Sequence, residues 1–463
     1  MALVESQQSR PRRGTELLLL LPAVGLGIAA VWIISMQLLG EFPAKAWQYV
    51  SLLVVLAGAF HLVVRRFAPY AAPVLLPMAV ALNGIGIAMI YRLDLASSAT
   101  GNNGVKQVVN TAVALIVAMA VLIVLRDHRK LRKYTYTAMV AALVLLTLPF
   151  TPIGKTVYGA TIWIEIAGYS FQPAELAKLF LSVFFAGYLV RNRDTLSLAG
   201  PKVLGVQLPR MRDLAPIAVV WMVAVAVLVF QRDLGTSLLF FGLFVVMLYL
   251  ATQRTSWILL GMVMFAVAAV LAYYTQPHVR SRIHGWLHAM DPEVYDAVGG
   301  SYQMVQGMFG MANGGLMGTG WGQGRPDLVP LAESDFIIAA LGEEIGLTGL
   351  LAILTIYLVI VQRGMRIALG VRDGFGKLLA GGLSFVMALQ VFIVVGGITR
   401  LIPITGLTTP FLAAGGSSLL ANWILIALLL RLSNAARSPG QPASRSEQRG
   451  RGGSAENVQV VTA

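Results

Sequence analysis

The chain lacks cysteine entirely and carries few charged residues. Of its 463 residues, 12% are charged and 57% are hydrophobic. Without cysteine, the protein has no disulfides, no thiol nucleophile and no cysteine-based metal site. Because soluble domains usually carry about 25% charged residues, this composition indicates a membrane protein.

Long apolar segments recur along most of the chain. Each is near the roughly 20 residues that an α-helix needs to cross a bilayer, and a helix satisfies its own backbone polar groups in lipid. Short alternating segments, which are typical of a membrane β-barrel, are absent. The sequence therefore predicts an all-α polytopic membrane protein with about twelve transmembrane helices. The segments lie near 16–40, 46–64, 72–92, 106–126, 134–152, 174–191, 213–231, 234–251, 256–275, 335–362, 377–399 and 409–431.

Basic residues account for the net charge of +14, and they gather on one side of the predicted bundle. If the twelve segments alternate in direction, the N-terminus, the tail and every second connection share that side. The positive-inside rule identifies it as the cytoplasm, so both termini should be cytoplasmic and nucleic-acid binding is not expected. The basic residues before the tail include Arg10, Arg12, Arg13, Arg65, Arg66, Arg126, Arg129, Lys130, Arg132, Lys133, Arg191, Arg193, Lys202, Arg210, Arg212, Arg254, Arg363, Arg366 and Arg372.

Charge and hydropathy divide the chain into four parts. A basic cytoplasmic N-terminus spans 1–15, N-terminal transmembrane helices span 16–152, and a transmembrane core spans 153–436. The tail 437–463 is rich in Ser, Gly, Arg and Gln, so we expect it to be disordered. The core contains one large external loop, 276–334, and a long ordered loop is usually functional.

Several charged residues lie within or beside the apolar segments. Glu175 and Lys178 share a helix face, either as a local ion pair or because they face a polar cavity. Asp233 lies at a tight external turn, where capping the next helix is the plainer interpretation. Glu343 and Glu344 lie inside a long apolar segment and need water, protons or cationic partners. A structural charge network and a substrate contact remain open for this pair.

Sequence motifs exclude several enzyme classes. There is no HExxH zinc motif, no GxxxxGK[ST] phosphate-binding loop and no GxSxG nucleophile motif. His284 and His288 could meet on one helix face and hold a metal, but spacing supplies no third ligand.

Characteristic motifs nevertheless run through residues 159–418. Together they resemble the SEDS family of shape, elongation, division and sporulation proteins, typified by RodA, FtsW and SpoVE. The stretch 399–403 favours the RodA branch. The motifs are Trp163 followed by Phe171-Gln172-Pro173-Ala174-Glu175 and Lys178, then Gln231-Arg232-Asp233-Leu234-Gly235-Thr236, Gly299 to Gln306, Asn313 to Gly322, Ser334 to Gly346, and Ile402 to Ser418.

Some positions depart from the family pattern. Ile162 replaces an arginine, Val394 an asparagine and Arg400 a glycine, while Ala413 and Ala414 replace a Ser-Tyr pair. Two helices also precede the ten of the family.

The resemblance implies a peptidoglycan glycosyltransferase that polymerises lipid II at the external face of the bacterial cytoplasmic membrane, in cell elongation or division. It also implies a class B penicillin-binding transpeptidase as partner. The family's catalytic aspartate lies six residues before the tyrosine that Tyr302 matches, which selects Asp296. Since the DPxxD pattern is one residue longer here, Asp291 is a second candidate.

Glycosyl transfer from a lipid diphosphate needs a base for the acceptor hydroxyl and positive charge for the leaving group. Lys178, Arg280 and Arg282 could oppose the diphosphate, and a divalent cation such as Mg²⁺ or Mn²⁺ could do the same. The predicted substrate-binding residues are Trp163, Glu175, Lys178, Arg280, Arg282, Tyr302, Gln303, Asp335 and Glu344.

Two other functions fit parts of the sequence. The intramembrane charges fit a flippase for the lipid precursor, but there is no internal inverted repeat. A non-catalytic scaffold for the transpeptidase is the other alternative, but it would give no function to the long external loop.

The predicted orientation can be tested by cysteine labelling, because the natural chain has no cysteine. A cysteine at Ser301, if accessible, should react with an impermeant thiol reagent in intact cells, whereas one at Ser438 should react only after the cells are opened. Labelling at Ser438 alone in intact cells would reverse the orientation.

Overall fold

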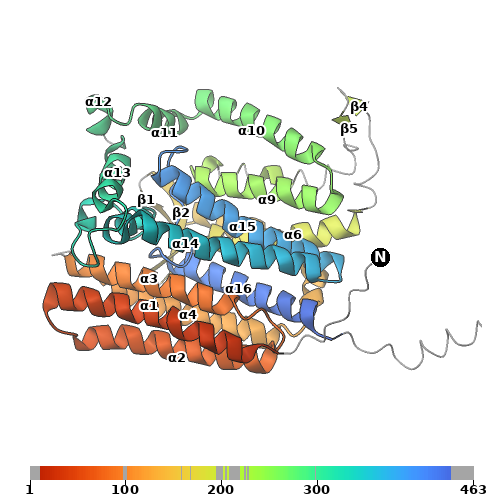
Figure 1. Ribbon diagram of the computed structural model, residues 1–463. Coiled ribbons are helices and arrows are strands. Elements are labelled where there is room, and N and C mark those ends of the chain that lie inside the picture. The colour runs from red at the N-terminus through yellow and green to blue at the C-terminus, as the bar shows by residue number, and fades with distance from the viewer. Residues whose placement is uncertain are drawn as a thin grey trace, which may run out of the picture.

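Long apolar helices run side by side through the computed structural model (Figure 1). The structure describes residues 11–439 apart from 97–101, 158, 167, 194–201, 204–205, 208–218, 220, 224–225, 227–228 and 298. The long helices are α1 (Arg13–Leu39), α2 (Ala44–Phe67), α3 (Leu75–Ala96), α4 (Asn103–Val124), α5 (Thr135–Thr147), α6 (Pro173–Arg191), α9 (Leu234–Thr252), α10 (Ser256–Thr275), α14 (Ile337–Gly370), α15 (Gly374–Ile398) and α16 (Gly416–Arg437).

Eleven helical segments in the described part of the chain are long and apolar enough to cross a membrane. They confirm the predicted all-α polytopic fold, with ends that differ by several residues from those expected. The remaining expected segment, 213–231, lies largely outside the described residues, as do 1–10 and the tail 440–463.

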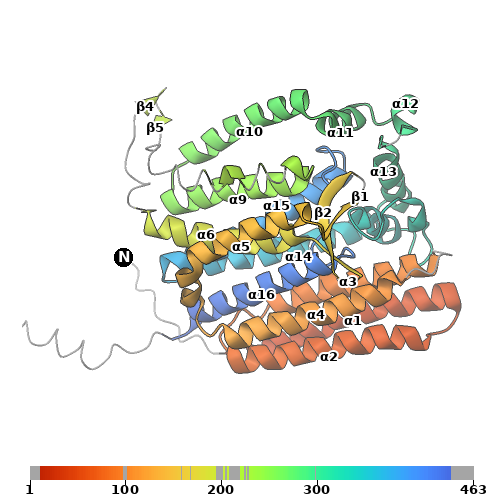
Figure 2. The ribbon, with the colours of Figure 1, turned by 180° about the vertical axis from the view of Figure 1, so that it is seen from behind.

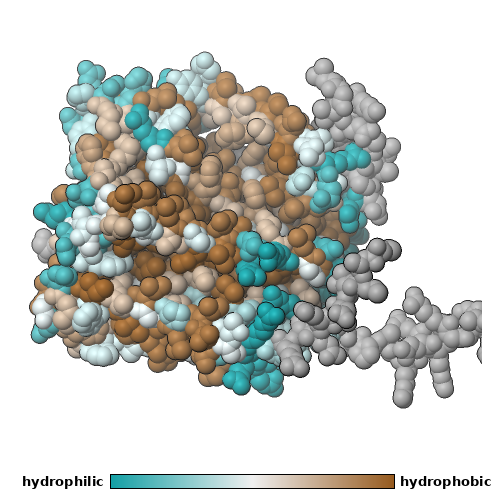
Figure 3. All heavy atoms as spheres, viewed as in Figure 1, coloured by the Kyte–Doolittle hydropathy of each residue, from teal (hydrophilic) through white to brown (hydrophobic). Residues whose placement is uncertain are grey.

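The two ends of the bundle differ in structure. α1 begins and α16 ends at one end, which also bears the basic connections η1 (His128–Tyr134) and the α14–α15 turn. The opposite end, here called the loop end, bears α11 (Pro277–Leu287), α12 (Pro292–Tyr295), α13 (Tyr302–Gly314) and η3 (Pro326–Leu328) (Figures 1 and 2). Figure 3 shows apolar side chains across the middle of one face and hydrophilic ones toward its ends, as a bilayer requires.

α10 stands away from the other helices. Only Trp257 and Gly261 are buried among its residues, while side chains such as Met262, Val267 and Leu271 are exposed. Figures 1 and 2 show it running along the edge of the bundle beyond α9 and continuing into α11. The arm formed by α10, α11 and α12 is therefore more exposed than the rest of the bundle, and it leads along the chain into α13.

The connection 153–173, which joins two of the predicted membrane segments, contains a small antiparallel sheet. Its strands are β1 (Gly154–Val157), β2 (Ala160–Ile166) and β3 (Tyr169–Phe171), in the order β1-β2-β3. Glycines at φ 78° (Gly159) and 81° (Gly168) allow the tight turns, and Lys155 pairs with Glu165 across β1 and β2 at 2.6 Å. A second pair, β4 (Lys202–Val203) and β5 (Val206–Gln207), lies after α6.

α14 is kinked where the sequence predicted a straight helix over 335–362. Gly346 has φ 67° inside it, and a Cβ atom there would lie 2.3 Å from the backbone nitrogen of Gly318. Only glycine fits that position, so the Gly-rich part of the loop packs directly against the kink.

Ser301 is buried, with 2% of its surface exposed, and its hydroxyl donates to the Ala289 carbonyl at 2.6 Å. It is therefore a poor position for the labelling experiment. Ala297, which is exposed on the same loop, is the better external reporter.

Close backbone contacts hold α3 against the connection between α15 and α16. A Cβ atom on Gly86 would lie 2.5 Å from the carbonyl oxygen and 2.7 Å from the Cα of Leu412. We expect Gly86→Ala to lower the unfolding free energy by about 1–3 kcal/mol through overpacking. Gly25→Ala is the matched control, since nothing lies within 4 Å of a Cβ there. Equal thermal unfolding temperatures for the two variants in detergent would contradict this packing.

Candidate active site at the loop end

Lys178 and Glu175 form an ion pair inside the helix bundle. Lys178 is 1% exposed, and its Nζ donates to Glu175 at 2.6 Å, to Gln390 at 2.8 Å and to Asn422 at 3.3 Å. The pair therefore joins α6 to α15 and α16. With these partners in place, Lys178 supports the scaffold and is not directed at a ligand.

A second buried network surrounds Glu343 and Glu344 on α14. Glu344 accepts from Arg92 of α3 at 2.8 Å, and the same guanidinium donates to the Gly324 carbonyl at 2.8 Å. Glu343 accepts from the Asn313 side chain at 2.9 Å and from the Arg325 backbone at 3.0 Å. The two carboxylates therefore link α14 to α3 and to the Gly-rich part of the loop. This is the structural charge network that the sequence left open as one of two interpretations.

A third polar cluster lies where α9, α11 and the start of α14 meet. Arg282 of α11 is partly buried, and its guanidinium donates to the Ile404 carbonyl at 3.0 Å. Burial lowers its pKa, while the charges of Asp233 and Asp335 act in the opposite direction. We call these three residues the carboxylate–arginine cluster. It joins three elements that are far apart in the sequence.

Asp233 caps α9, as the plainer interpretation expected, but it does more than cap. Its Oδ1 accepts from the backbone nitrogen of Thr236 at 2.9 Å, while Oδ2 is buried without a hydrogen-bond partner among the described residues. Burial raises the pKa of Asp233, and the nearby Glu175 raises it further. The sequence predicts the cap, but nothing in it indicates that Asp233 lies near Arg282.

Asp335 resembles Asp233 in its environment. Its pKa is raised by burial, although Ser334 donates a hydrogen bond to it at 2.8 Å and Arg282 is nearby. The carboxylate–arginine cluster thus holds two carboxylates that carry charge less readily than they would in water.

α11 is held at the bundle by a reciprocal set of hydrogen bonds. The Trp286 indole donates to the Arg400 carbonyl at 3.0 Å, and Arg400 donates to the carbonyls of Trp286 and Leu287, each at 2.9 Å. Arg400 has φ 59°, a conformation that glycine adopts more easily. The left-handed backbone therefore explains why the family pattern has glycine at this position. The arginine found here also binds the last carbonyl groups of α11.

Further basic residues lie next to members of the cluster in the sequence. Arg232 and Arg280 are exposed, and Arg280 donates to the Tyr274 carbonyl at 3.2 Å while lying over the Tyr273 ring. Burial lowers the pKa of His278, and nearby Arg282 and Arg232 lower it further. His278 is therefore neutral at pH 7, and the positive charge near it comes from arginine.

Asp296 and Asp291 flank the short helix α12. Asp291 accepts from His288 at 3.1 Å. Asp296 ends the helix with an exposed side chain that has no hydrogen bond or ion pair among the described residues. Both carboxylates are exposed, and Asp296 is the one that has no protein partner among the described residues.

Three further predicted site residues lie on two elements, α13 and β2. Tyr302 is 45% exposed and packs edge-on against Tyr295 with ring centroids 5.2 Å apart. Gln303 donates to the Pro330 carbonyl at 3.2 Å. Trp163 is half-buried in β2. Of these, Tyr302 lies closest along the chain to Asp296, and no contact joins either one to the carboxylate–arginine cluster.

The described donor groups do not fit a metal held by the protein alone. His284 and His288 stack with centroids 4.9 Å apart, and the described residues contain no group of three His, Asp or Glu side chains that could hold an ion.

Comparison with known proteins decides the family. A family model described as "Cell cycle protein", for the FtsW, RodA and SpoVE proteins, matches residues 73–438. The chain belongs to this family. The peptidoglycan glycosyltransferase RodA of Mycobacterium tuberculosis is 47% identical over 442 residues, covering 94% of this chain and 93% of that protein. The probable peptidoglycan glycosyltransferase FtsW of Geobacter metallireducens is 33% identical, covering 80% and 96%.

Solved structures share the fold. Thermus thermophilus Rod shape determining protein RodA aligns with a TM-score of 0.57 and 23% identity, over 80% of this chain and 98% of that chain. A chain of a peptidoglycan synthase complex aligns with a TM-score of 0.54 and 23% identity, over 84% and 98%. The predicted family and enzyme class, a peptidoglycan glycosyltransferase, are thereby confirmed. The family match begins after α1 and α2.

Asp233 offers a test of the carboxylate–arginine cluster. Asn caps a helix about as well as Asp, so Asp233→Asn keeps the bond to Thr236 and removes a buried charge. Because the pKa of Asp233 is raised in the folded state, its ionisation opposes folding as pH rises from near 4 through that raised value. We expect Asp233→Asn to unfold at an equal or higher temperature than wild type at pH 7, with the difference vanishing at low pH.

Asp233→Ala is the control, because it removes the cap and should cost about 1 kcal/mol. A lower unfolding temperature for Asp233→Asn than for wild type at pH 7 would show that the charge itself stabilises the fold.

Proposed function

We propose that this enzyme polymerises lipid II at the loop end of the bundle, with Asp296 as the general base. The observation that carries the proposal is an exposed carboxylate without a hydrogen-bond or ion-pair partner among the described residues, in the folded loop that also carries Arg280 and Arg282. The identity to proteins named peptidoglycan glycosyltransferase supports the reaction class.

The reaction needs one proton transfer and one substitution. Asp296 accepts the proton of the acceptor sugar's 4-hydroxyl, whose oxygen forms a bond to the donor's anomeric carbon. The bond from that carbon to the phosphate oxygen breaks, and the lipid diphosphate leaves with both electrons. Its negative charge develops in the transition state, where fixed positive charge is most effective.

Arg232, Arg280 and Arg282 are the groups best placed to meet that diphosphate. Arg232 and Arg280 are exposed, and Arg282 lies behind them in the carboxylate–arginine cluster. Lys178, which the sequence also offered for this role, instead pairs with Glu175 inside the bundle. The arginines match phosphate oxygens with paired donors.

The polyprenyl tail of the substrate lies in the membrane, against the helices of the protein. The exposed apolar face of α10 leads toward Arg280 and Arg282, because α10 continues directly into α11. A polyprenyl chain lying against it would keep its diphosphate at the interface. In this proposal the loop end lies outside the bacterial cytoplasmic membrane and both termini lie in the cytoplasm, which the basic bias supports.

A class B penicillin-binding transpeptidase is the proposed partner. Support comes from one similar structure, which belongs to a complex described as coordinating polymerisation and crosslinking. The exposed helix α10, with few contacts inside the chain, offers a surface on which a membrane helix of such a partner could pack.

Substituting Asp296 tests the proposed base. Asp296→Asn keeps the shape and removes the proton acceptor, so lipid II polymerisation by purified protein should fall by about 10²- to 10⁴-fold. Gel analysis of labelled glycan strands measures this rate. The thermal unfolding temperature should not change, because no described group depends on this carboxylate.

Asp291→Asn is the matched control, since Asp291 is on the same short helix and already pairs with His288. Its effect should be smaller. Near wild-type polymerisation by Asp296→Asn together with loss in Asp291→Asn would assign the base to Asp291. Movement of lipid II across vesicles without any glycan strands from the wild-type protein would instead support a flippase.

A further inference from the structure

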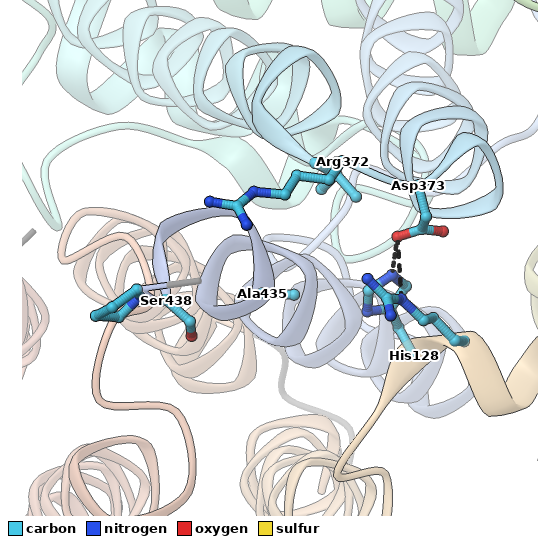
Figure 4. A pocket seen from close by; sticks show the side chains of 8 residues that line it. His128, Arg372, Asp373, Ala435 and Ser438 are labelled. Carbon is cyan, nitrogen blue, oxygen red and sulfur yellow. Dashed lines mark hydrogen bonds and ion pairs between the residues drawn. The ribbon is translucent and has the colours of Figure 1, made fainter. Parts of the chain in front are cut away.

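A cavity of about 290 Å³ opens at the end of the bundle that bears both termini, opposite the proposed reaction centre. Figure 4 shows that three separate connections line it. His128 and Arg129 come from η1, Arg372 and Asp373 from the α14–α15 turn, and Ser438 from the end of α16. Its volume is near the lower limit of the roughly 300–1,000 Å³ typical of small-molecule sites.

Asp373 already neutralises part of the charge in this pocket. Its Oδ2 lies 2.7 Å from His128 Nε2 and 3.7 Å from Arg129 Nε, while Oδ1 accepts from the Gly376 backbone at 2.7 Å. Burial alone would raise the pKa of Asp373, but the bonds from Gly376 and His128 outweigh it, so the pKa is lowered. The carboxylate is therefore ionised at neutral pH.

Arg372 is not part of that arrangement. It is exposed and makes no hydrogen bond or ion pair among the described residues. In Figure 4 its side chain extends over the end of α16 toward Ser438, away from Asp373. One wall of the pocket thus presents a guanidinium that has no carboxylate beside it.

More arginines lie behind this wall. Arg437 is within electrostatic range of Arg12, Arg13 and Arg363. Glu16 pairs with Arg13, but the Nε of Arg363 is buried without a hydrogen-bond partner among the described residues. Basic residues are expected at this end of any such protein. What that rule does not explain is that two of the arginines at this end, Arg129 and Arg372, line one cavity from two separate connections.

We propose that this pocket binds a phosphate group through Arg129 and Arg372. Arginine pairs with phosphate oxygens through two parallel hydrogen bonds, and basic pockets between transmembrane helices on this side of a membrane suit anionic lipid headgroups. The phosphate belongs either to an acidic phospholipid of the adjacent leaflet or to a soluble phosphate compound. Bound there, it joins η1 and the α14–α15 turn beside the end of α16, which should stabilise the fold.

The test is a titration of the full-length protein in neutral detergent with three probes, followed by thermal unfolding. The probes are short-chain phosphatidylglycerol, short-chain phosphatidylcholine and inorganic phosphate at constant ionic strength. Phosphatidylglycerol should raise the unfolding temperature and phosphatidylcholine should not. The double variant Arg129→Gln/Arg372→Gln should weaken the apparent affinity about 25-fold, since each arginine near an acidic headgroup contributes about fivefold.

Two further variants separate a built site from general surface charge. Arg65→Gln/Arg66→Gln removes two exposed arginines from the end of α2 and should leave the affinity unchanged. Asp373→Asn keeps the cap of α15 but removes the competing charge, so it should bind the probe more tightly.

The outcomes decide both the site and the ligand's source. An equal response to inorganic phosphate, lost in Arg129→Gln/Arg372→Gln, would identify a soluble phosphate compound in place of a lipid. Equal responses of wild type and that variant to every probe, or an equal loss in Arg65→Gln/Arg66→Gln, would overturn the proposal. None of these substitutions touches the reaction centre, so the proposed polymerase activity is tested separately.

Discussion

An ammonium group placed among apolar helices would be very costly without partners. Lys178 avoids that cost because Glu175, Gln390 and Asn422 surround it, and these partners come from three helices, α6, α15 and α16. The helices must therefore keep one relative position. Arg92 and Glu344 impose the same constraint on α3 and α14. The polar groups inside this bundle thus define its geometry, since apolar side chains gain little from choosing one neighbour over another in lipid.

That rigid interior supports a less constrained loop end. The kink at Gly346 and the acceptor Glu343 hold the Gly-rich segment against α14, and Arg400 holds the end of α11. Asp296 lies beyond these supports, on a short helix whose side chains are mostly exposed. A reacting group on a loop that is anchored on both sides can meet a large substrate while its supports stay fixed.

The two polar ends of the molecule face different environments. At the loop end, carboxylates and arginines alternate in the carboxylate–arginine cluster, which suits a substrate that carries both hydroxyls and phosphate. At the opposite end, arginines dominate and Asp373 is one of few counter-charges. Helices such as α14 and α16 connect the two ends directly, so a ligand at one end contacts elements that also support the other.

The sequence by itself determined the membrane class, the helical architecture, the sidedness of the basic residues and the family. These follow from hydropathy, charge and motif order, which are properties of neighbours along the chain. It also identified Arg282, Asp335 and Asp296, but as separate positions. Only the tertiary structure decided that Arg282 lies near both Asp233 and Asp335. It also showed that Lys178 is hydrogen-bonded to partners inside the bundle and that 153–173 forms a sheet. The physical reason is that a charge's role depends on which groups surround it, and helices distant in sequence supply those groups.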